Sequence, residues 1–509
     1  LWWGHRIPAW HCSACGGITV EREDPTACTH CGSTAIEQDP DVLDTWFSSG
    51  LWPLTTLGWP ERTADFDRFY PTALMETGWD ILFFWVARMM MFGLKFGGDV
   101  PFRTVFLHSM VLGEDGRKMS KMRGNVVDPM ELIETYGADS LRFYLATMAG
   151  QDQGIIFSRA RVEGYRNFCN KLWNAARFAL MNLEDFGADE LAAYRQAVIE
   201  PADVGPLSLA DRWILARALE VAVEVDGLLE QFRLDLAAHA IYQFVWYELC
   251  DWYLELAKVN LRENAPPAER RATQGTLATV FDLVLRVLHP IIPFITEEIW
   301  QRLPRPQGSP ASLMLAEFPR PQERDGARVL TLAGPVTRSG AILADERTLS
   351  ARDDMAALTD FTVAARSLKA EFKLAPGKRV EVLIRSADPE IRACVGRIHP
   401  LVVHLAKLSS LRLLEPSETP PQEAATDVVR GAEVILPLAG LVDFAAERAR
   451  LGREREKLLK EADGLTAKLQ NPGFRAKAPP EVIARGEARL AELQGDLERL
   501  QATLQRLGG

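Results

Sequence analysis

The spacing of apolar and polar positions divides the chain into four regions. Over residues 1–150, short apolar runs alternate with helix-like segments and with Gly and Pro, which is typical of an α/β domain. Residues 105–107 are predicted to form a short buried strand, and Asp128 and Pro129 to start a helix as its N-cap and first residue. Over residues 151–320, long stretches repeat apolar positions at helical spacing, which predicts a helical bundle.

The helix predicted over residues 239–260 contains aromatic residues at short intervals, including Tyr242, Trp246 and Tyr253. Aromatic residues at helical spacing are more often bundle core than platforms on which RNA bases stack, so burial is the favoured interpretation. Residues 321–440 are expected to hold a linker rich in Pro and Gly, followed by a small mixed α/β region with a helix near residues 355–372.

Residues 441–509 carry the clearest periodic pattern. Leucines spaced three and four residues apart form two stripes typical of a heptad seam, and a segment containing Pro and Gly separates them. This pattern predicts an antiparallel coiled-coil hairpin. Its tip, residues 468–485, has four basic residues and one acidic residue, which suits a phosphate backbone, although a solvated hairpin end is the alternative. The basic residues are Lys468, Arg475, Lys477 and Arg485.

Length, charge and cysteine usage narrow the class of protein. At 509 residues the chain is too long for one hydrophobic core. Its net charge of −11 argues against indiscriminate nucleic-acid binding, although local basic patches can still bind phosphate. The sequence has no apolar run of the length needed to span a bilayer and no signal-peptide pattern. Four of the seven cysteines are clustered and three are isolated, which favours a reducing compartment, and we expect a cytoplasmic monomer.

The clustered cysteines have the spacing of a metal site. Cys12 and Cys15 form one Cys-x-x-Cys pair, and twelve residues separate it from a second pair, Cys28 and Cys31. Four thiolates are the tetrahedral ligand set that zinc prefers, and a site without an open position is structural. His11 and His30 adjoin these positions, and either could replace a cysteine. A redox dithiol and unrelated thiols are the alternatives.

Residues 116–125 are the strongest candidate for a catalytic segment. Lys118 and Lys121 lie three residues apart, Ser120 precedes the second lysine, and Gly116 and Gly124 flank the segment. Two ammonium groups on a mobile loop suit the triphosphate of ATP, because displacement of pyrophosphate requires neutralisation of the charge that develops on the leaving group. A solvated basic turn is the alternative.

The same segment resembles the Lys-Met-Ser-Lys-Ser loop of class I aminoacyl-tRNA synthetases. Residues 41–50 are similar to the subgroup for valine, isoleucine and leucine, and residues 1–8 and 77–85 narrow the resemblance to the valyl-tRNA synthetase family. Met122 departs from the pattern, since the family usually has a second serine there, and Ser109 stands where glycine is more usual. Isoleucyl- and leucyl-tRNA synthetases are the rivals within the class.

The resemblance implies a multidomain α/β plus all-α protein. It would contain the C-terminal half of a Rossmann-like class I catalytic domain with a zinc knuckle over residues 11–33, a helical anticodon-binding bundle and a C-terminal antiparallel coiled coil. Valine would be activated with ATP and Mg²⁺ and transferred to tRNA(Val). The resemblance implies that Lys118 and Lys121 are catalytic groups and that these lysines bind ATP together with Ser120 and His108. It implies that Trp46 and Trp85 surround the valine side chain and that Gly78 and Asp80 contact the adenylate or the amino group. The four basic residues of the hairpin tip would bind tRNA.

The sequence contains no His-x-Gly-His element, which class I synthetases use to bind ATP, and no editing domain. We therefore expect the C-terminal portion of a longer synthetase, inactive alone. A hypothesis from another class is a non-catalytic tRNA-binding module that uses the zinc knuckle, the bundle and the hairpin without activation chemistry.

Overall fold

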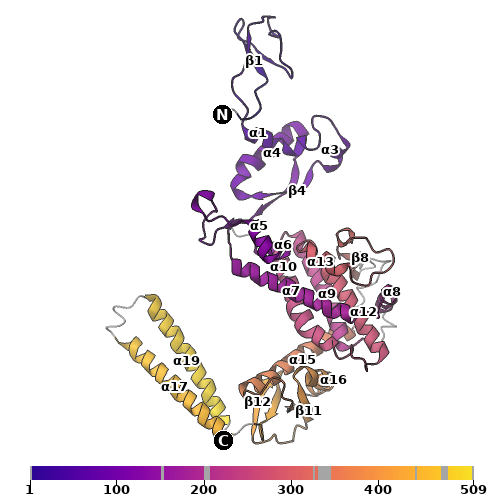
Figure 1. Ribbon diagram of the computed structural model, residues 1–509, viewed down its shortest axis with the longest axis vertical. Coiled ribbons are helices and arrows are strands. Elements are labelled where there is room, and N and C mark those ends of the chain that lie inside the picture. The colour runs from indigo at the N-terminus through magenta and orange to yellow at the C-terminus, as the bar shows by residue number, and fades with distance from the viewer. Residues whose placement is uncertain are drawn as a thin grey trace.

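The computed structural model describes residues 3–150, 154–199, 207–324, 327–330, 346–441, 444–471 and 480–506. Figure 1 shows these residues as a series of units that follow one another along the chain. The first unit is a small antiparallel sheet in the order β2-β1-β3, built from β1 (Ala9–Cys12), β2 (Ile18–Val20) and β3 (Ile36–Gln38). Cys12 ends β1, and the other three clustered cysteines lie in the connections that follow β1 and β2.

A parallel pair of strands follows, formed by β4 (Thr72–Gly78) and β5 (Phe102–His108). The preceding helices are α1 (Thr45–Gly50), α2 (Trp52–Thr55) and α3 (Ala64–Phe69). Between the strands lie the 3₁₀ turn η1 (Trp79–Ile81), the π-helical turn η2 (Leu82–Val86), α4 (Ala87–Phe92) and the π-helical turn η3 (Gly93–Gly97). The small core of this unit consists of Met75, Val86, Met89 and Phe102.

The strand predicted at residues 105–107 is present within β5, but the prediction that it is buried is wrong. Leu107 is 40% exposed, as is Leu74 on the neighbouring strand β4. In the part of the chain that the structure describes, β4 and β5 form a sheet of two strands whose core contacts come from η2 and α4. Such a narrow sheet leaves apolar side chains in contact with solvent.

A second parallel pair, β6 (Met110–Leu112) and β7 (Gly154–Ile156), flanks the lysine-rich segment and two helices. The 3₁₀ turn η4 (Lys121–Arg123) ends that segment, and α5 (Pro129–Tyr136) and α6 (Ala138–Met148) follow. Asp128 caps α5 as predicted, since its Oδ1 accepts a hydrogen bond from the Met130 N–H at 2.8 Å.

The helical bundle is formed by α7 (Arg159–Met181), α8 (Ala188–Ile199), α9 (Leu209–Glu230), α10 (Leu234–Gln243), the π-helix η6 (Phe244–Tyr253), α11 (Leu254–Ala257), α12 (Pro267–Leu288) and α13 (Pro293–Trp300). The predicted burial of its aromatic residues is confirmed for Phe244 and Tyr253, whereas Tyr247 is exposed. A buried ion cluster lies inside it: Asp282 pairs with Arg195 at 2.9 Å and with Arg286 at 3.1 Å.

Helix α6 joins the α/β region to the break between α12 and α13. Arg142 donates to the carbonyls of Ile291 and Pro290, at 2.8 and 3.0 Å. Asp139 Oδ2 accepts a hydrogen bond from the Ile295 N–H at 2.7 Å, so it satisfies an N–H in the first turn of α13. Burial raises the pKa of Asp139, although these N–H groups partly offset the rise.

A mixed α/β unit follows the 3₁₀ turn η7 (Leu313–Leu315) and the paired strands β8 (Pro321–Arg324) and β9 (Ala327–Leu330). It contains α15 (Glu346–Glu371), β10 (Val380–Arg385), α16 (Pro389–Leu405), β11 (Leu408–Leu414), β12 (Ala424–Val429) and β13 (Ala432–Pro437), with strand order β11-β10-β13-β12. The predicted helix near residues 355–372 is part of α15, and the core of this unit is continuous with that of the bundle.

Two long helices end the described chain, α17 (Phe444–Gln470) and α19 (Pro480–Arg506), and Figure 1 shows them side by side. They run antiparallel, because Arg489 pairs with Glu461 at 3.0 Å and Leu469 lies against Gly486. Leu469 and Leu493 are buried. Among the predicted tip residues, Lys468 and Arg485 lie at the facing ends of the helices, while Arg475 and Lys477 fall outside the described residues. No described helix has the length and hydropathy needed to cross a membrane.

Candidate functional site

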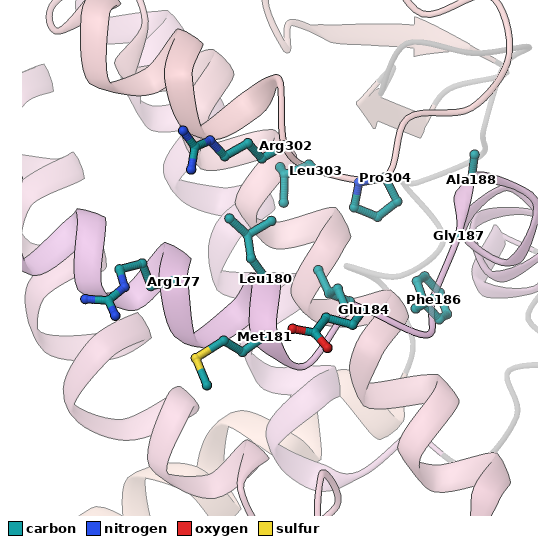
Figure 2. A pocket seen from close by; sticks show the side chains of 11 residues that line it. Arg177, Leu180, Met181, Glu184, Phe186, Gly187, Ala188, Arg302, Leu303 and Pro304 are labelled. Carbon is teal, nitrogen blue, oxygen red and sulfur yellow. The ribbon is translucent and has the colours of Figure 1, made fainter.

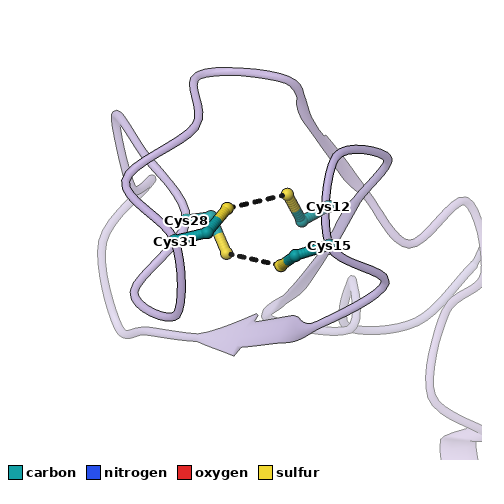
Figure 3. A group of neighbouring side chains, drawn as sticks. All are labelled: Cys12, Cys15, Cys28 and Cys31. Atoms are coloured by element: carbon teal, nitrogen blue, oxygen red, sulfur yellow. Dashed lines mark hydrogen bonds between the residues drawn. The ribbon is translucent and has the colours of Figure 1, made fainter.

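The four clustered cysteines meet at one point, as Figure 3 shows. Each Cys-x-x-Cys segment closes a turn with a glycine in the left-handed region: Gly16 donates to the Cys12 carbonyl and Gly32 to the Cys28 carbonyl, both at 2.9 Å. All four Sγ atoms lie within 4.8 Å of one another, and the pairs Cys12–Cys31 and Cys15–Cys28 are 3.7 Å apart. Four sulfurs tetrahedrally placed about 2.3 Å from zinc would be separated by about 3.8 Å, so this geometry fits a zinc ion.

The neighbouring histidines are occupied elsewhere. His11 Nε2 lies 2.9 Å from Asp39 Oδ2, and His30 Nε2 donates to the Ile18 carbonyl at 3.1 Å. The geometry therefore favours a four-cysteine ligand set over one in which a histidine replaces a cysteine. The His30 N–H lowers the pKa of Cys28 to about 6. The pKa of Cys15 is raised to about 12, because the effect of the Gly17 N–H, which lowers it, is outweighed by Cys31 and the other thiols. Several thiolates in one place repel each other unless a cation neutralises them.

The carboxyl ends of β4 and β5 bring three of the predicted site residues together. Gly78 and His108 are register partners at these ends, and Asp80 follows two residues after Gly78. A Cβ atom at position 78 would lie 2.7 Å from Asp80 Oδ1, so a larger side chain there would displace the carboxylate. His108 Nδ1 donates to the Ser109 carbonyl at 3.1 Å, which leaves Nε2 facing Glu76 at 3.6 Å.

Residues 116–125, the lysine loop, reach this same edge. Lys118 Nζ lies 3.2 Å from Asp80 Oδ2, and Lys118 is 66% exposed, so the pair remains accessible to a ligand. Lys121 opens η4, and its side chain is exposed, as is that of Met122. The structure thus brings Lys118, Asp80, Gly78 and His108 to one edge of the sheet.

Asn125 holds the loop in its shape, a role that the sequence did not reveal. Its Oδ1 accepts a hydrogen bond from the Ser120 N–H at 2.9 Å, and its Nδ2 donates to Asp115 Oδ1 at 3.2 Å. The Arg117 N–H and the Asn125 amide lower the pKa of Asp115. A short amide directly after Gly124, which has φ of +68°, is the one signal that could have indicated this anchor. Glu76 was also missed, because only strand pairing brings it to His108.

The two tryptophans predicted to flank a substrate lie on neighbouring elements but contact different rings. Trp46 stacks on Phe84 with ring centroids 6.0 Å apart, whereas Trp85 lies 6.3 Å from Trp52. The Trp85 indole N–H also donates to the Ser49 carbonyl at 3.0 Å. Trp85 is therefore fixed against α1 and α2, and its predicted role toward a substrate remains a prediction.

A separate cavity of about 620 Å³ lies at the far end of α7, in the bundle. Figure 2 shows Arg177 and Arg302 on one side of it and the turn that carries Phe186 on the other. Leu180 and Leu303 lie between them. The Arg302 guanidinium lies over the Trp173 ring at 5.6 Å and pairs with Glu298. The cavity therefore combines apolar walls with the guanidinium groups of Arg177 and Arg302 and the carboxylate of Glu184, and it is far in sequence from the lysine loop.

Three family models match successive parts of the chain. Residues 1–157 match the class I tRNA synthetases for isoleucine, leucine, methionine and valine. Residues 211–384 match the anticodon-binding domain of tRNA ligase, and residues 443–508 match the valyl tRNA synthetase tRNA binding arm. The order of the models agrees with the order of the units in the structure.

Curated relatives align along the whole chain. The valine–tRNA ligase of Syntrophotalea carbinolica is 44% identical over 508 residues, which is 100% of this chain and 53% of that protein. The enzyme of the same name from Thermotoga maritima is 40% identical over 507 residues, again 100% of this chain and 53% of that protein. The chain thus spans about half the length of the curated relatives it matches.

Solved structures give a weaker likeness. The LeuRS–tRNA–LeuAMS ternary complex of Agrobacterium radiobacter K84 agnB2 is 20% identical, with a TM-score of 0.48 over 69% of this chain and 48% of that chain. The sequence matches are stronger and agree with one another, since the arm model and the listed relatives both point to valine–tRNA ligases. By sequence, the chain is similar over its whole length to valine–tRNA ligases, and its first and last parts match models of class I tRNA synthetases and of the valyl tRNA synthetase tRNA binding arm.

Proposed function

We propose that this chain is the part of a valine–tRNA ligase that carries the lysine loop, the zinc knuckle and the tRNA-binding units. The observation that carries the proposal is the approach of Lys118 to Asp80 beside Gly78 and His108, because it places a cationic loop over the end of two parallel strands. Ligands of open α/β sheets bind outside the carboxyl ends of the strands. The full-length similarity to valine–tRNA ligases supports valine as the amino acid.

The reaction proceeds in two steps. The carboxylate of valine attacks the α-phosphorus of ATP, and the bond to the bridging oxygen breaks as pyrophosphate leaves with Mg²⁺. The terminal ribose hydroxyl of tRNA(Val) then attacks the carbonyl carbon of the adenylate, and AMP leaves. Lys118 and Lys121 neutralise the charge that develops on pyrophosphate, and Ser120 and His108 contact ATP.

Asp80 has two partners in this scheme. In the structure its carboxylate pairs with Lys118, and during valine activation it would receive the α-amino group of valine while Lys118 turns to the phosphates. Such an exchange suits an exposed pair, since neither charge is left buried and unpaired when the pair breaks. Trp46 and Trp85 limit the space for the valine side chain.

The cysteine cluster holds a structural zinc ion through Cys12, Cys15, Cys28 and Cys31. The support is the donor set itself, four thiols at separations that match tetrahedral coordination. Zinc would hold β1 to the two turns of the small sheet, which has few buried side chains of its own.

Two units contact tRNA. The antiparallel helices α17 and α19 form a coiled-coil arm whose basic end, with Lys468, Arg475, Lys477 and Arg485, meets the phosphate backbone. The cavity beside Arg177 and Arg302 accepts an unpaired base against its apolar walls, and the exposed Arg177 meets the adjoining phosphate, since Arg302 is paired with Glu298. The match of residues 211–384 to an anticodon-binding domain supports a tRNA-binding role for the bundle, and it includes Arg302 of this cavity.

The decisive experiment is ATP–pyrophosphate exchange with a panel of amino acids. The complete synthetase that contains this chain should exchange with valine and only weakly with threonine or isoleucine, and exchange driven by isoleucine or leucine instead would refute the assignment. The 509-residue chain is also assayed alone, and we expect it to bind tRNA(Val) but not to catalyse ATP–pyrophosphate exchange. Tight tRNA binding together with an inactive complete protein would favour the non-catalytic tRNA-binding module.

A further inference from the structure

One bulky residue adopts a backbone conformation that usually requires glycine. Phe232 has φ of +57° and follows the end of α9. Its N–H donates to the Leu229 carbonyl at 3.0 Å, and the Arg233 N–H donates to the Leu228 carbonyl at 2.8 Å. These two hydrogen bonds define a Schellman helix end, in which the residue with positive φ is most often glycine or asparagine. A phenylalanine at this position is an outlier that asks for a reason.

The reason lies in the ring of Phe232, which is packed against the α/β region. Its centroid lies 5.5 Å from that of Phe106, and the planes are inclined by 32°. Phe106 belongs to β5 and stands two residues before His108, so both side chains leave the strand on the same face. Phe232 is 38% exposed, which shows that the ring does not fill a core. Its described ring contact is this one between the bundle and β5.

The same turn also approaches the other side of His108. Arg233 binds the Asp235 carboxylate with two hydrogen bonds, at 2.9 and 2.7 Å, which fixes the start of α10. A Cβ atom at Gly150 would lie 3.5 Å from Asp235 Oδ2. The Gly150 carbonyl in turn accepts a hydrogen bond from Ser109 Oγ at 2.8 Å. The turn between α9 and α10 therefore contacts β5 through Phe232, and the first residues of α10 approach Gly150, which binds the residue after His108.

We infer that Phe232 is a positioning residue for the activation reaction, fixing the end of β5, and with it His108, relative to the helical bundle. The inference rests on the proposed function only in placing the reaction at this edge; the mechanical contact stands on the structure. A glycine at position 232 would suit the helix end better but would release β5. The contact of the Phe232 ring with β5 offsets the cost of the unfavourable backbone conformation.

The first test is amide hydrogen exchange, measured by mass spectrometry on the 509-residue chain. Phe232→Gly should make amides of residues 102–108 exchange about fivefold faster, while those of α9 keep their rates, because only the contact with β5 is lost. Phe232→Tyr keeps the ring and should match the wild type. Lys373→Gly is the matched control: Lys373 has φ of +52° at an equivalent helix end after α15, with an exposed side chain. Unchanged exchange over residues 102–108 in Phe232→Gly would overturn the inference.

The second test uses valine-dependent ATP–pyrophosphate exchange by the complete synthetase. Phe232→Gly should lower kcat about tenfold, since it misplaces His108, which contacts ATP in the proposed site. Phe232→Tyr and Lys373→Gly should retain the wild-type kcat. An unchanged kcat in Phe232→Gly rejects the positioning role even if exchange over residues 102–108 is faster. If the wild-type enzyme shows no valine-dependent ATP–pyrophosphate exchange, the proposed function fails. The amide hydrogen-exchange result then decides alone whether Phe232 fixes β5.

Discussion

The helical bundle and the α/β region differ in how deeply they bury some of their largest aromatic residues. In the bundle Phe168, Phe281 and Trp300 are buried almost completely, within one core that extends into the mixed α/β unit. In the α/β region Trp79 and Phe83 are exposed to 53% and 75%. The bundle is thus stabilised by its own packing, whereas the α/β region presents apolar surface, which in soluble proteins marks a surface that binds something else.

The two regions also use charge differently. Asp282, Arg195 and Arg286 form a buried cluster that serves the fold, while Lys118 and Asp80 form an exposed pair at the candidate site. This contrast predicts that substitutions in the bundle change stability, and that substitutions at the edge of β4 and β5 change activity. The following predictions test that division, beginning with the largest expected effect.

Removal of zinc should unfold the small cysteine sheet and leave the bundle intact. Binding of structural zinc contributes about 10–16 kcal/mol in zinc-finger peptides, far more than so small a sheet can gain from packing. Cys28→Ser should therefore lose the metal, measured by elemental analysis as a drop from one zinc per chain, while the melting temperature of the bundle stays constant. Cys250→Ser, in the bundle, is the control and should keep its zinc. Full zinc content in Cys28→Ser would contradict the assignment.

Asp282→Asn should destabilise the bundle by about 3–5 kcal/mol, because it leaves two guanidinium groups without a counter-charge in a buried site. Arg286 is only 5% exposed. Urea denaturation followed by circular dichroism measures the change. Asp360→Asn, which breaks an exposed pair with Arg430, is the control and should cost less than about 1 kcal/mol. Equal losses in the two variants would show that burial does not distinguish the pairs.

Lys121→Ala should lower the rate of valine activation in the complete synthetase about 10²–10³-fold, the usual loss when one group that stabilises developing charge is removed. Its side chain is exposed, so the melting temperature should not change. Lys95→Ala removes an exposed lysine from η3 in the same region and should leave the rate unaltered. A loss of stability in Lys121→Ala would assign the lysine to the fold instead of the reaction.

The stability of the bundle should fall in acid partly through Asp282. Burial raises the pKa of this carboxyl, but Arg195 and Arg286 outweigh that effect and hold it below its ordinary value. Because the pKa is lower in the folded state, the stabilisation is present above the ordinary value of about 3.9 and is lost as the pH falls toward the folded value. Urea unfolding at neutral and at acid pH measures the loss of stability in acid, which should be larger for the wild type than for Asp282→Asn. Identical losses would show that this carboxyl does not contribute to the pH dependence of stability.

Phe83→Ser should have the smallest effect on the fold, below about 0.5 kcal/mol, since the side chain already lies in solvent. Phe281→Ala is the contrasting substitution and should cost about 3–5 kcal/mol, because it opens a cavity in the bundle core. Thermal unfolding of both variants measures the difference. If Phe83→Ser were as destabilising as Phe281→Ala, the contrast between the two regions would be incorrect.

The features that sequence revealed are local ones. The spacing of the cysteines predicted the cluster because each Cys-x-x-Cys turn is closed by its own glycine, and Asp128 caps α5 through a hydrogen bond two residues away. Helical spacing likewise predicted the burial of Phe244 and Tyr253. The approach of Lys118 to Asp80, the pairing of Glu76 with His108 and the contact of Phe232 with Phe106 span 38, 32 and 126 residues of sequence, and no local pattern encodes them. The exposure of Leu107 was missed for the same reason, since burial depends on which elements cover the sheet.

The hydrogen bonds from α6 to the break between α12 and α13 make the two regions interdependent during folding. Arg142 and Asp139 satisfy backbone groups of residues 290–295 that the break itself leaves without partners. Until α6 docks, those groups depend on water, so the last helix of the bundle cannot be completed in its native form without a helix of the region that carries the lysine loop. A chain cut between α6 and α7 would therefore give two products that are each less cooperative than the whole, even though the cut falls at an apparent domain boundary.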